Sequence, residues 1–196
     1  MVIAKNRLLT IEEYLDYDDG TDSHDYELVD GVLVNMADEM PINTTIVTFL
    51  IIRFFQLGVS PYCLAAGHTI EMQSKRATAR KPDLIVHSEK SSTATLQDRL
   101  LRLDQPVPRL VVEVASNSQK DKSSYRRDYV DKRKEYEQRG IPEYWIIDPI
   151  AESVVVLSLT DSAYQESTFR GDSRIVSAEF PELTLSASQI LLVDDV

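Results

Sequence analysis

Cysteine, histidine and basic residues are scarce in this chain of 196 residues. The single cysteine, Cys63, excludes an intramolecular disulfide framework and is typical of a protein from a reducing compartment. The three histidines, His24, His68 and His87, lack the HxxxH or similar spacing of a zinc site. The 21 Lys and Arg are outnumbered by 32 Asp and Glu, and this net charge of −11 argues against general coating of nucleic acid.

Long apolar runs and the motifs of several enzyme classes are also absent. The most hydrophobic stretch, residues 42–57, is shorter than the about 20 residues of a membrane-spanning helix and contains Arg53. The start of the chain shows no targeting segment, so we expect a cytoplasmic protein with no membrane association. Neither a GxxxxGK[ST] loop nor a GxSxG motif occurs. The length predicts a single domain over residues 1–196, and the 43% of hydrophobic residues supply its core.

Acidic and basic residues are distributed unevenly along the chain. Residues 1–39 carry a net charge of −9, whereas residues 75–81 carry +4 and residues 120–139 carry +3. Each basic window has an ordinary interpretation as an exposed loop or a solvated helix face. Each basic window also lies next to one of the carboxylate motifs described below. The sequence is therefore compatible with a locally basic cleft in an acidic protein.

Local signals predict strands and helices in mixed order. Thr10 and Glu13 form a capping-box pattern, Asp30-Gly31 is a hairpin signal, and Pro41 and Gly58 bound a predicted helix. Strands covered on both faces are predicted at 83–86 and 110–114, followed by an amphipathic helix at 121–139. Strands at 143–149 and 153–159 then precede a strand-rich tail with a short helix near residue 187. This order predicts an α/β or α+β domain with a mixed central sheet flanked by helices.

Two acids occur in or beside these apolar strands. Glu113 has apolar neighbours on both sides, where an ionised carboxylate is costly unless it is paired, bound to metal or at a strand end. Asp83 follows Pro82, a pair that alone indicates only the start of a turn or strand. Together, carboxylates on two adjacent strands are typical of a site for Mg²⁺. Nearby bases would favour an anionic substrate such as nucleic acid: Arg80, Lys81, Lys120 and Lys122.

The predicted helix at 121–139 supplies a further element of the site. At 100° per residue, one stripe about 100° wide contains Tyr125, Asp128, Tyr129, Lys132 and Tyr136. The three tyrosines predict that this stripe packs inward, which places Lys132 on a buried or cleft-facing side. The alternative is a Lys132 that snorkels to solvent or pairs with Asp128. A base-stacking role for the tyrosines is the weaker interpretation beside core packing.

Taken together, these segments resemble the Uma-type family, a branch of the PD-(D/E)XK restriction-endonuclease-like nuclease superfamily. The resemblance covers about residues 10–160 and rests on Tyr26–Gly31, Pro82-Asp83, Glu113–Ser116, the spacing of Asp128, Lys132 and Tyr136, and Gly140–Pro149. The superfamily pattern places a Lys two residues after the acid, where this chain has Ala115. The branch that it resembles commonly lacks that Lys as well, and Lys132 on the following helix is expected to deliver the amine instead.

The resemblance implies a restriction-endonuclease-like fold with extra strands at the C-terminus, and a metal-dependent endodeoxyribonuclease that acts on DNA. Asp83, Glu113 and the main-chain oxygen of Val114 would bind Mg²⁺, with Mn²⁺ as a substitute, and Glu27 would complete the acidic shell. Lys132 would orient the attacking water and stabilise charge on the phosphate. Assembly as a homodimer is an expectation at the level of the fold alone.

Two other interpretations stay open. One is a catalytically inactive nuclease-fold module that binds nucleic acid or a protein partner. The net charge of −9 over residues 1–39 favours it, because that charge suits a protein interface better than contact with DNA. The other is an unrelated α/β domain in which the acids are structural. A shared metal site requires the carboxylates of Asp83 and Glu113 to converge within about 5 Å, with the amine of Lys132 nearby.

Overall fold

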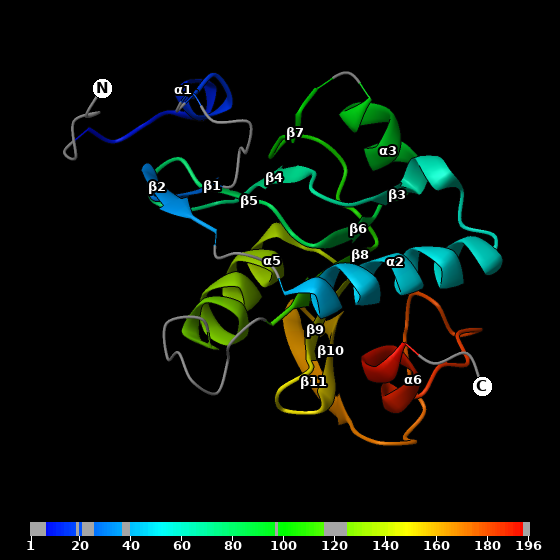
Figure 1. The fold of residues 1–196 in the computed structure, drawn as a ribbon. Helices are drawn as coiled ribbons and strands as arrows, with labels where there is room; N and C mark the ends of the chain where they lie inside the picture. Colours follow the sequence, from blue (N-terminus) through cyan, green and yellow to red (C-terminus); the bar gives the residue numbers. More distant parts are fainter. Residues whose placement is uncertain are drawn as a thin grey trace.

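The chain forms an α/β structure with two mixed β-sheets, shown in Figure 1 by the computed structural model. The structure describes residues 7–18, 20, 26–36, 40–96, 98–115 and 125–193. In chain order the elements are α1 (Ile11–Leu15), β1 (Tyr26–Val29), β2 (Val32–Asn35), α2 (Pro41–Gln56), η1 (Pro61–Cys63), β3 (Leu64–Ala65), β4 (Thr69–Glu71), β5 (Ala79–Arg80), β6 (Leu84–Val86), α3 (Glu89–Thr95), β7 (Leu100–Leu101), β8 (Leu110–Val114), η2 (Arg127–Lys132), α5 (Arg133–Arg139), β9 (Glu143–Asp148), β10 (Ser153–Thr160), β11 (Ala163–Phe169) and α6 (Ala187–Leu192).

The strands are divided between a smaller and a larger sheet. The smaller sheet has the order β2-β1-β5-β4-β7, and the larger has the order β11-β10-β9-β8-β6-β3. Within them, β4 pairs with β7 and β8 pairs with β9 in parallel, whereas the other described pairs are antiparallel. The mixed sheet flanked by helices is therefore confirmed, but the strands form two sheets instead of a single central one.

The local signals of the amino-terminal half are confirmed. Thr10 caps α1 with a complete capping box. The hairpin of β1 and β2 turns at Asp30 and Gly31, whose φ angles of 48° and 82° suit the positive φ that this kind of two-residue turn requires. α2 begins at Pro41, and Gly58, with a φ of 89°, lies just beyond its end.

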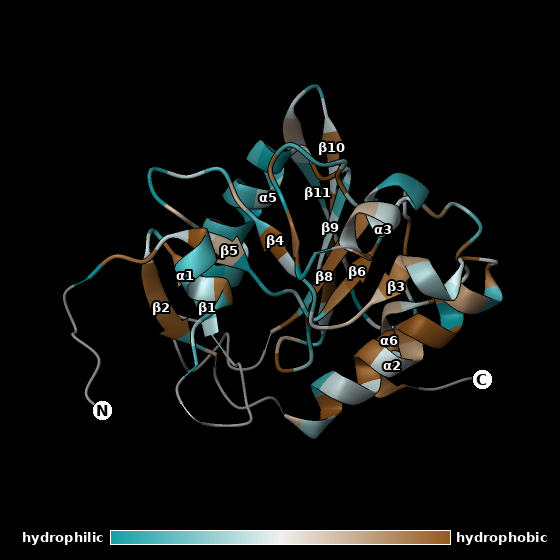
Figure 2. Ribbon diagram, turned by 90° about the horizontal axis from the view of Figure 1, so that it is seen from above, coloured by the Kyte–Doolittle hydropathy of each residue, from teal (hydrophilic) through white to brown (hydrophobic). Residues whose placement is uncertain are grey.

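The predicted buried strands at 83–86 and 110–114 are β6 and β8, which pair antiparallel inside the larger sheet. Leu110, Val112 and Val114 of β8 pack in one apolar cluster, and Val111 packs in a second cluster on the opposite face. This alternation follows from the two-residue period of a strand. Figure 2 shows apolar colouring along β6, β8 and much of α2, and hydrophilic colouring in much of α5.

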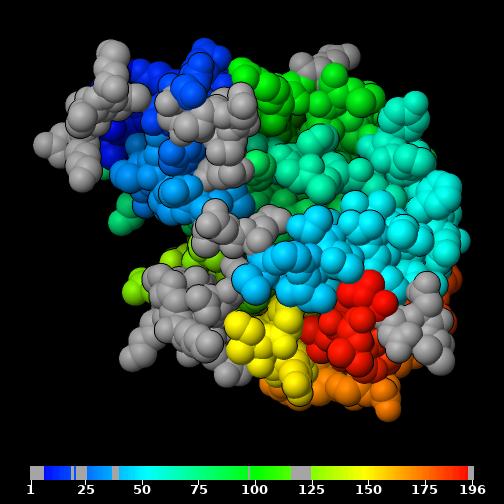
Figure 3. Space-filling model, in the orientation of Figure 1, coloured from blue at the N-terminus to red at the C-terminus, as the bar shows by residue number. Residues whose placement is uncertain are grey.

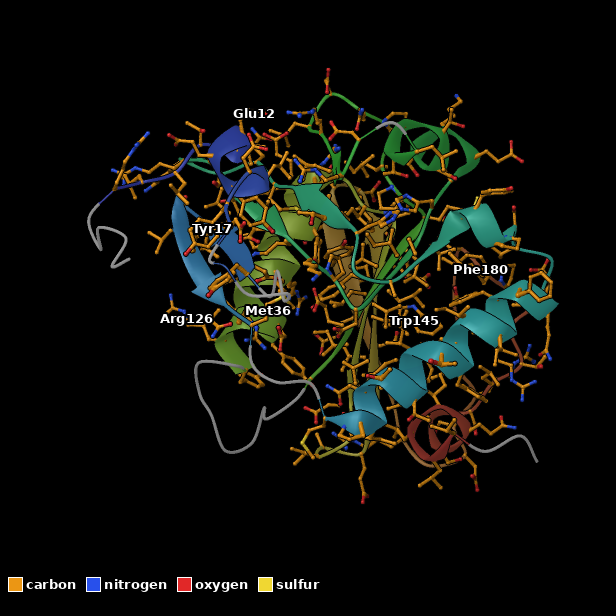
Figure 4. All side chains as sticks on the ribbon, turned by 45° about the horizontal axis from the view of Figure 1, so that its top comes forward. Glu12, Tyr17, Met36, Arg126, Trp145 and Phe180 are labelled. Carbon is orange, nitrogen blue, oxygen red and sulfur yellow. The ribbon has the colours of Figure 1, made fainter. Side chains whose placement is uncertain are left out.

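Helices cover both faces of the larger sheet. On one face lie α2, α6 and the carboxyl-terminal tail, where the ring of Phe54 is 6.1 Å from that of Trp145 and 4.7 Å from that of Phe180. Trp145 and Phe180 are labelled along α2 in Figure 4. On the other face, Tyr136 of α5 packs in one cluster with Ile70 of the smaller sheet. In Figure 3 the blue amino-terminal part and the red and orange carboxyl-terminal part lie at opposite corners of the molecule.

The predicted helix at 121–139 differs from expectation in its winding. Residues 127–132 are π-helical, residues 133–139 continue as α5, and Gly140 ends the helix with a φ of 76°. Asp128, Lys132 and Tyr136 of the predicted stripe are buried as expected, although a π-helical turn holds more residues than an α-helical turn. Only Tyr136 of the three tyrosines is fully buried, whereas Tyr129 is half-buried and Tyr125 is 48% exposed. Residues 121–124, like Ser116, Lys120 and His24, lie outside the described residues.

The carboxyl-terminal tail also differs in part from expectation. The short helix near residue 187 is confirmed as α6. Between β11 and α6, however, the described chain contains an isolated bridge between Arg174 and Ser186 where further strands were expected. In the described part of the chain, no helix has both the length and the apolar character needed to cross a membrane.

Candidate active site

Four elements bring the predicted site residues to one small pocket. Glu27 comes from β1, Asp83 directly precedes β6, Glu113 belongs to β8, and Lys132 is the last residue of η2. The pocket has a volume of about 40 Å³, which is room for on the order of three water molecules. Its other lining residues are Val34, Asn35, Met36, Asn43, Val114, Arg127 and Asp128.

The pairing of β6 with β8 positions Asp83. Leu84 lies opposite Val112 in this antiparallel pair, so one further step places Asp83 beside Glu113. The main-chain N–H of Val114 donates a hydrogen bond of 2.5 Å to Oδ2 of Asp83. The side chain of Asn43, in the first turn of α2, donates to the main-chain oxygen of Val114 at 3.3 Å. Sequence reasoning missed Asn43, although its polarity in the apolar run 42–57 was the available signal.

Lys132 is buried, and its amine lies among carboxylates. Nζ is 2.8 Å from Oε2 of Glu113, 3.1 Å from Oε1 of Glu27 and 3.8 Å from Oδ1 of Asp128. Burial alone would lower the pKa of Lys132, but the charges of Glu113 and Glu27 outweigh it and raise the pKa. The side chain is therefore an ammonium at neutral pH. The alternative in which Lys132 snorkels to solvent is wrong, and its contact with Asp128 is the longest of the three.

Glu113 is held by two donors in the interior. Besides the amine of Lys132, the hydroxyl of Tyr136 donates a hydrogen bond of 2.7 Å to Oε1. Burial raises the pKa of Glu113 to about 7 against the opposing effect of Lys132, and the charges of Asp128 and Glu27 add to the rise. Glu113 is thus paired with the amine of Lys132 in this structure, and pairing is one of the three environments expected for an ionised carboxylate at this position. A carboxylate oxygen accepts about two hydrogen bonds, so each oxygen keeps capacity for a further ligand.

Glu27 is tied to a buried arginine. Nη1 of Arg80 donates to Oε2 of Glu27 at 2.8 Å, and the same guanidinium makes two bonds of 2.7 and 2.9 Å to Glu135. Burial would raise the pKa of Glu27, but Lys132 and Arg80 outweigh it and lower the pKa to about 2. The expectation that Arg80 faces an anionic substrate is wrong, because this side chain is buried and engaged by two carboxylates.

Arg127 is a cation of the pocket that the sequence did not single out. Its guanidinium donates to both carboxylate oxygens of Asp128, at 2.9 and 3.2 Å. The hydroxyl of Tyr144 donates to the main-chain oxygen of Asp128 at 3.0 Å, which fixes η2 against the larger sheet. The only sequence signal for Arg127 was its position in the basic window at 120–139. That window contains eight bases, and no pattern distinguishes Arg127 from the others.

The donor atoms of the pocket fit a hard divalent cation. Asp83, Glu113 and Val114 line the pocket, and carboxylate and carbonyl oxygens are the ligands that Mg²⁺ prefers. Within the described residues, no group of three or more His, Cys, Asp or Glu side chains is arranged to hold a metal. Two carboxylates completed by a carbonyl, water and a substrate phosphate are nevertheless the usual protein environment of Mg²⁺.

The fold and this pocket define a restriction-endonuclease-like α/β domain. Comparison with protein families matches residues 11–188 to the family described as "Uma2: Putative restriction endonuclease", so the chain belongs to the Uma2 family. This confirms the resemblance seen in the sequence and extends it beyond residue 160. No curated protein is similar enough to this chain to count as a match.

A solved structure supports the fold independently. It is described as a "putative nuclease belonging to DUF820 from Anabaena variabilis ATCC 29413", and the two structures align with a TM-score of 0.65. The alignment covers 94% of this chain and 98% of that chain at 16% sequence identity. At this identity the similarity establishes a shared fold, with its mixed sheets and flanking helices.

Proposed function

We propose that this protein is a Mg²⁺-dependent DNA endonuclease that hydrolyses phosphodiester bonds in the pocket of Asp83, Glu113 and Lys132. The observation that carries the proposal is the buried ammonium of Lys132, 2.8 Å from Glu113 in a pocket that Asp83 also lines. Burying a lysine and several carboxylates is costly unless they are paired. Membership of the Uma2 family gives the pocket a nucleolytic context.

In this proposal the acids hold the metal. Asp83, Glu113 and the main-chain oxygen of Val114 would bind Mg²⁺, and Mn²⁺ would substitute for it. When bound, the ion would polarise the phosphate and lower the pKa of a coordinated water. Glu27 would hold Lys132 in place, since its Oε1 is 3.1 Å from Nζ. The hydroxyl of Tyr136 would orient the carboxylate of Glu113.

Lys132 would act as a cation and not as a base. Its raised pKa, caused by Glu113 and Glu27 in spite of burial, leaves no neutral amine at neutral pH. An ammonium at this position would stabilise the negative charge that develops on the phosphate oxygens. It would also orient the attacking water by donating a hydrogen bond. Arg127, which lines the same pocket, would add a second positive charge toward the substrate.

The test is nicking of supercoiled plasmid DNA by the full chain. We expect nicking with Mg²⁺ or Mn²⁺ and none with EDTA. Asp83→Asn and Lys132→Met should each lower the rate at least about a hundredfold, a loss comparable to the removal of one transition-state donor. Lys134→Met is the matched control, because Lys134 is exposed two residues further along. Circular dichroism of each variant at the assay temperature would verify that it is folded.

Three results would contradict the proposal. Equal nicking by wild type and Asp83→Asn would assign the activity to a contaminant. Absence of nicking with either metal, together with salt-dependent DNA binding, would favour the inactive nucleic-acid-binding module. Absence of both nicking and DNA binding would favour a module that binds a protein partner.

A further inference from the structure

A second pocket lies on the other side of residues 125–133, the segment that carries Lys132. It has a volume of about 310 Å³, which is at the lower end of the volumes that small ligands occupy. Tyr125 and Tyr129 come from this segment, whereas Asp148, Glu166 and Arg170 come from the β9–β11 part of the larger sheet. Arg133 completes the charged part of its lining. Arg126, labelled in Figure 4, lies next to Tyr125 in the same segment.

The two tyrosines form a preorganised aromatic platform. Their ring centroids are 4.5 Å apart and their planes are inclined by only 11°, which is a stacked pair. The hydroxyl of Tyr129 donates a hydrogen bond of 3.0 Å to Oδ2 of Asp148, and this bond fixes the inner ring. Tyr125 lies outside it and is 48% exposed. An aromatic ring that is already ordered loses little conformational entropy when a ligand stacks on it.

Each charged group of this pocket is engaged by another group of the protein. The guanidinium of Arg133 is 2.6 Å from the carboxylate of Glu166. Asp148 accepts the hydroxyl of Tyr129 and the main-chain N–H groups of Ile150 and Ala151. Arg170 donates to the main-chain oxygen of Ala151. Such a neutral, internally bonded lining suits a flat uncharged ring better than a phosphate.

From these observations we infer that the pocket of Tyr125 and Tyr129 binds an unpaired DNA base by stacking while the phosphate of the same strand occupies the Lys132 pocket. Residues 125–133 carry both sets of groups: Arg127, Asp128 and Lys132 line the phosphate side, and Tyr125, Tyr129 and Arg133 line the base side. The inference deepens the proposed function and rests on it for the position of the phosphate. Stacking on tyrosine tolerates any base, so this subsite would add affinity without sequence preference.

The test uses a single-stranded DNA oligonucleotide with 2-aminopurine, whose fluorescence falls when the base stacks. The full chain is titrated with it in EDTA, so that cleavage does not interfere. We expect wild type and Tyr125→Phe to quench the probe equally, because both keep the ring. Tyr125→Ala should lose the quenching and weaken binding at least fivefold, which is about 1 kcal/mol. Tyr62→Ala is the control, because Tyr62 is 75% exposed and lies outside this pocket.

The outcomes separate this subsite from the nuclease proposal. Quenching and affinity in Tyr125→Ala equal to wild type would overturn the inference, as would a Tyr125→Phe variant that behaves like Tyr125→Ala. Because the titration needs no metal, failure of the plasmid to nick would leave a positive quenching result intact. A lower melting temperature in Tyr125→Ala with unchanged quenching would show that Tyr125 only shields Tyr129, and would also overturn the inference.

Discussion

The amine of Lys132 lies 2.8 Å from Oε2 of Glu113, although the two residues come from a π-helical turn and a buried strand. The same amine is 3.1 Å from Glu27 of the other sheet. Lys132 therefore joins both sheets and the helix that crosses between them. A residue in this position would contribute to stability as well as to the proposed catalysis, and the two contributions are measured in different ways.

Replacing Lys132 by Met should destabilise the fold strongly. The substitution keeps the length of the side chain but leaves Glu113 buried without its cation. Removal of one partner from a buried pair costs about 3–5 kcal/mol of unfolding free energy. Urea denaturation in EDTA measures this loss against Lys134→Met, whose exposed position predicts a change within about 0.5 kcal/mol. Equal effects of the two substitutions would show that the ion pair with Glu113 contributes nothing to stability.

Glu113 should make stability fall as the pH rises from about 4.5 to about 7. Burial raises the pKa of Glu113 from 4.5 in the unfolded chain to about 7 in the folded protein. Between these values the folded state binds a proton that the unfolded state does not, so raising the pH favours unfolding. Glu113→Gln removes this contribution. The difference in unfolding free energy between wild type and Glu113→Gln, measured in EDTA over this range, should decline with pH. A constant difference would contradict the expected titration.

His87 should make the stability of the protein fall as the pH decreases from 6.5 toward 4. Burial, with a contribution from the nearby His68, lowers the pKa of His87 from 6.5 to about 4. Its Nε2 is buried and has no hydrogen-bond partner among the described residues. As the pH falls from 6.5 toward 4, the unfolded chain takes up a proton that the folded protein does not, and stability is lost. His87→Gln should lose less stability than wild type in this window. His68→Gln should show a smaller effect in the same direction, because burial also lowers the pKa of His68 and its charge contributes to the lowered pKa of His87.

Much of the site could be predicted because it depends on local patterns. The acids Asp83 and Glu113 belong to short apolar runs that read as neighbouring buried strands, and the register of β6 with β8 follows from that pairing. The hairpin at Asp30-Gly31 likewise placed Glu27 in a strand. Such signals depend on a few consecutive residues, and in these segments the tertiary structure keeps the local structure that the residues favour.

Other parts of the structure depend on contacts that the sequence does not display. Strands β4, β5 and β7 contain only three, two and two residues, too few for a visible period, so the smaller sheet could not be separated from the larger. The bond from Arg80 to Glu135 joins residues 55 positions apart. Lys132 lies in a π-helical turn that no sequence pattern displays, and the hydroxyl of Tyr144 donates to the main-chain oxygen of Asp128 in the same turn.

Addition of Mg²⁺ should stabilise the protein through Asp83. A ligand that binds only the folded state adds about 2.7 kcal/mol at a hundred times its dissociation constant, which raises the melting temperature of a chain of this size by roughly 5–10 °C. Asp83→Asn removes one oxygen anion from the pocket and should abolish most of this rise. Asp104→Asn makes the same change at an exposed position, and its response to Mg²⁺ should equal that of wild type. Thermal unfolding followed by circular dichroism, with and without Mg²⁺, measures all three proteins without any DNA. A similar rise in wild type and Asp83→Asn would place the bound ion elsewhere, because a pocket that has lost one of its two proposed carboxylate ligands should bind Mg²⁺ far more weakly.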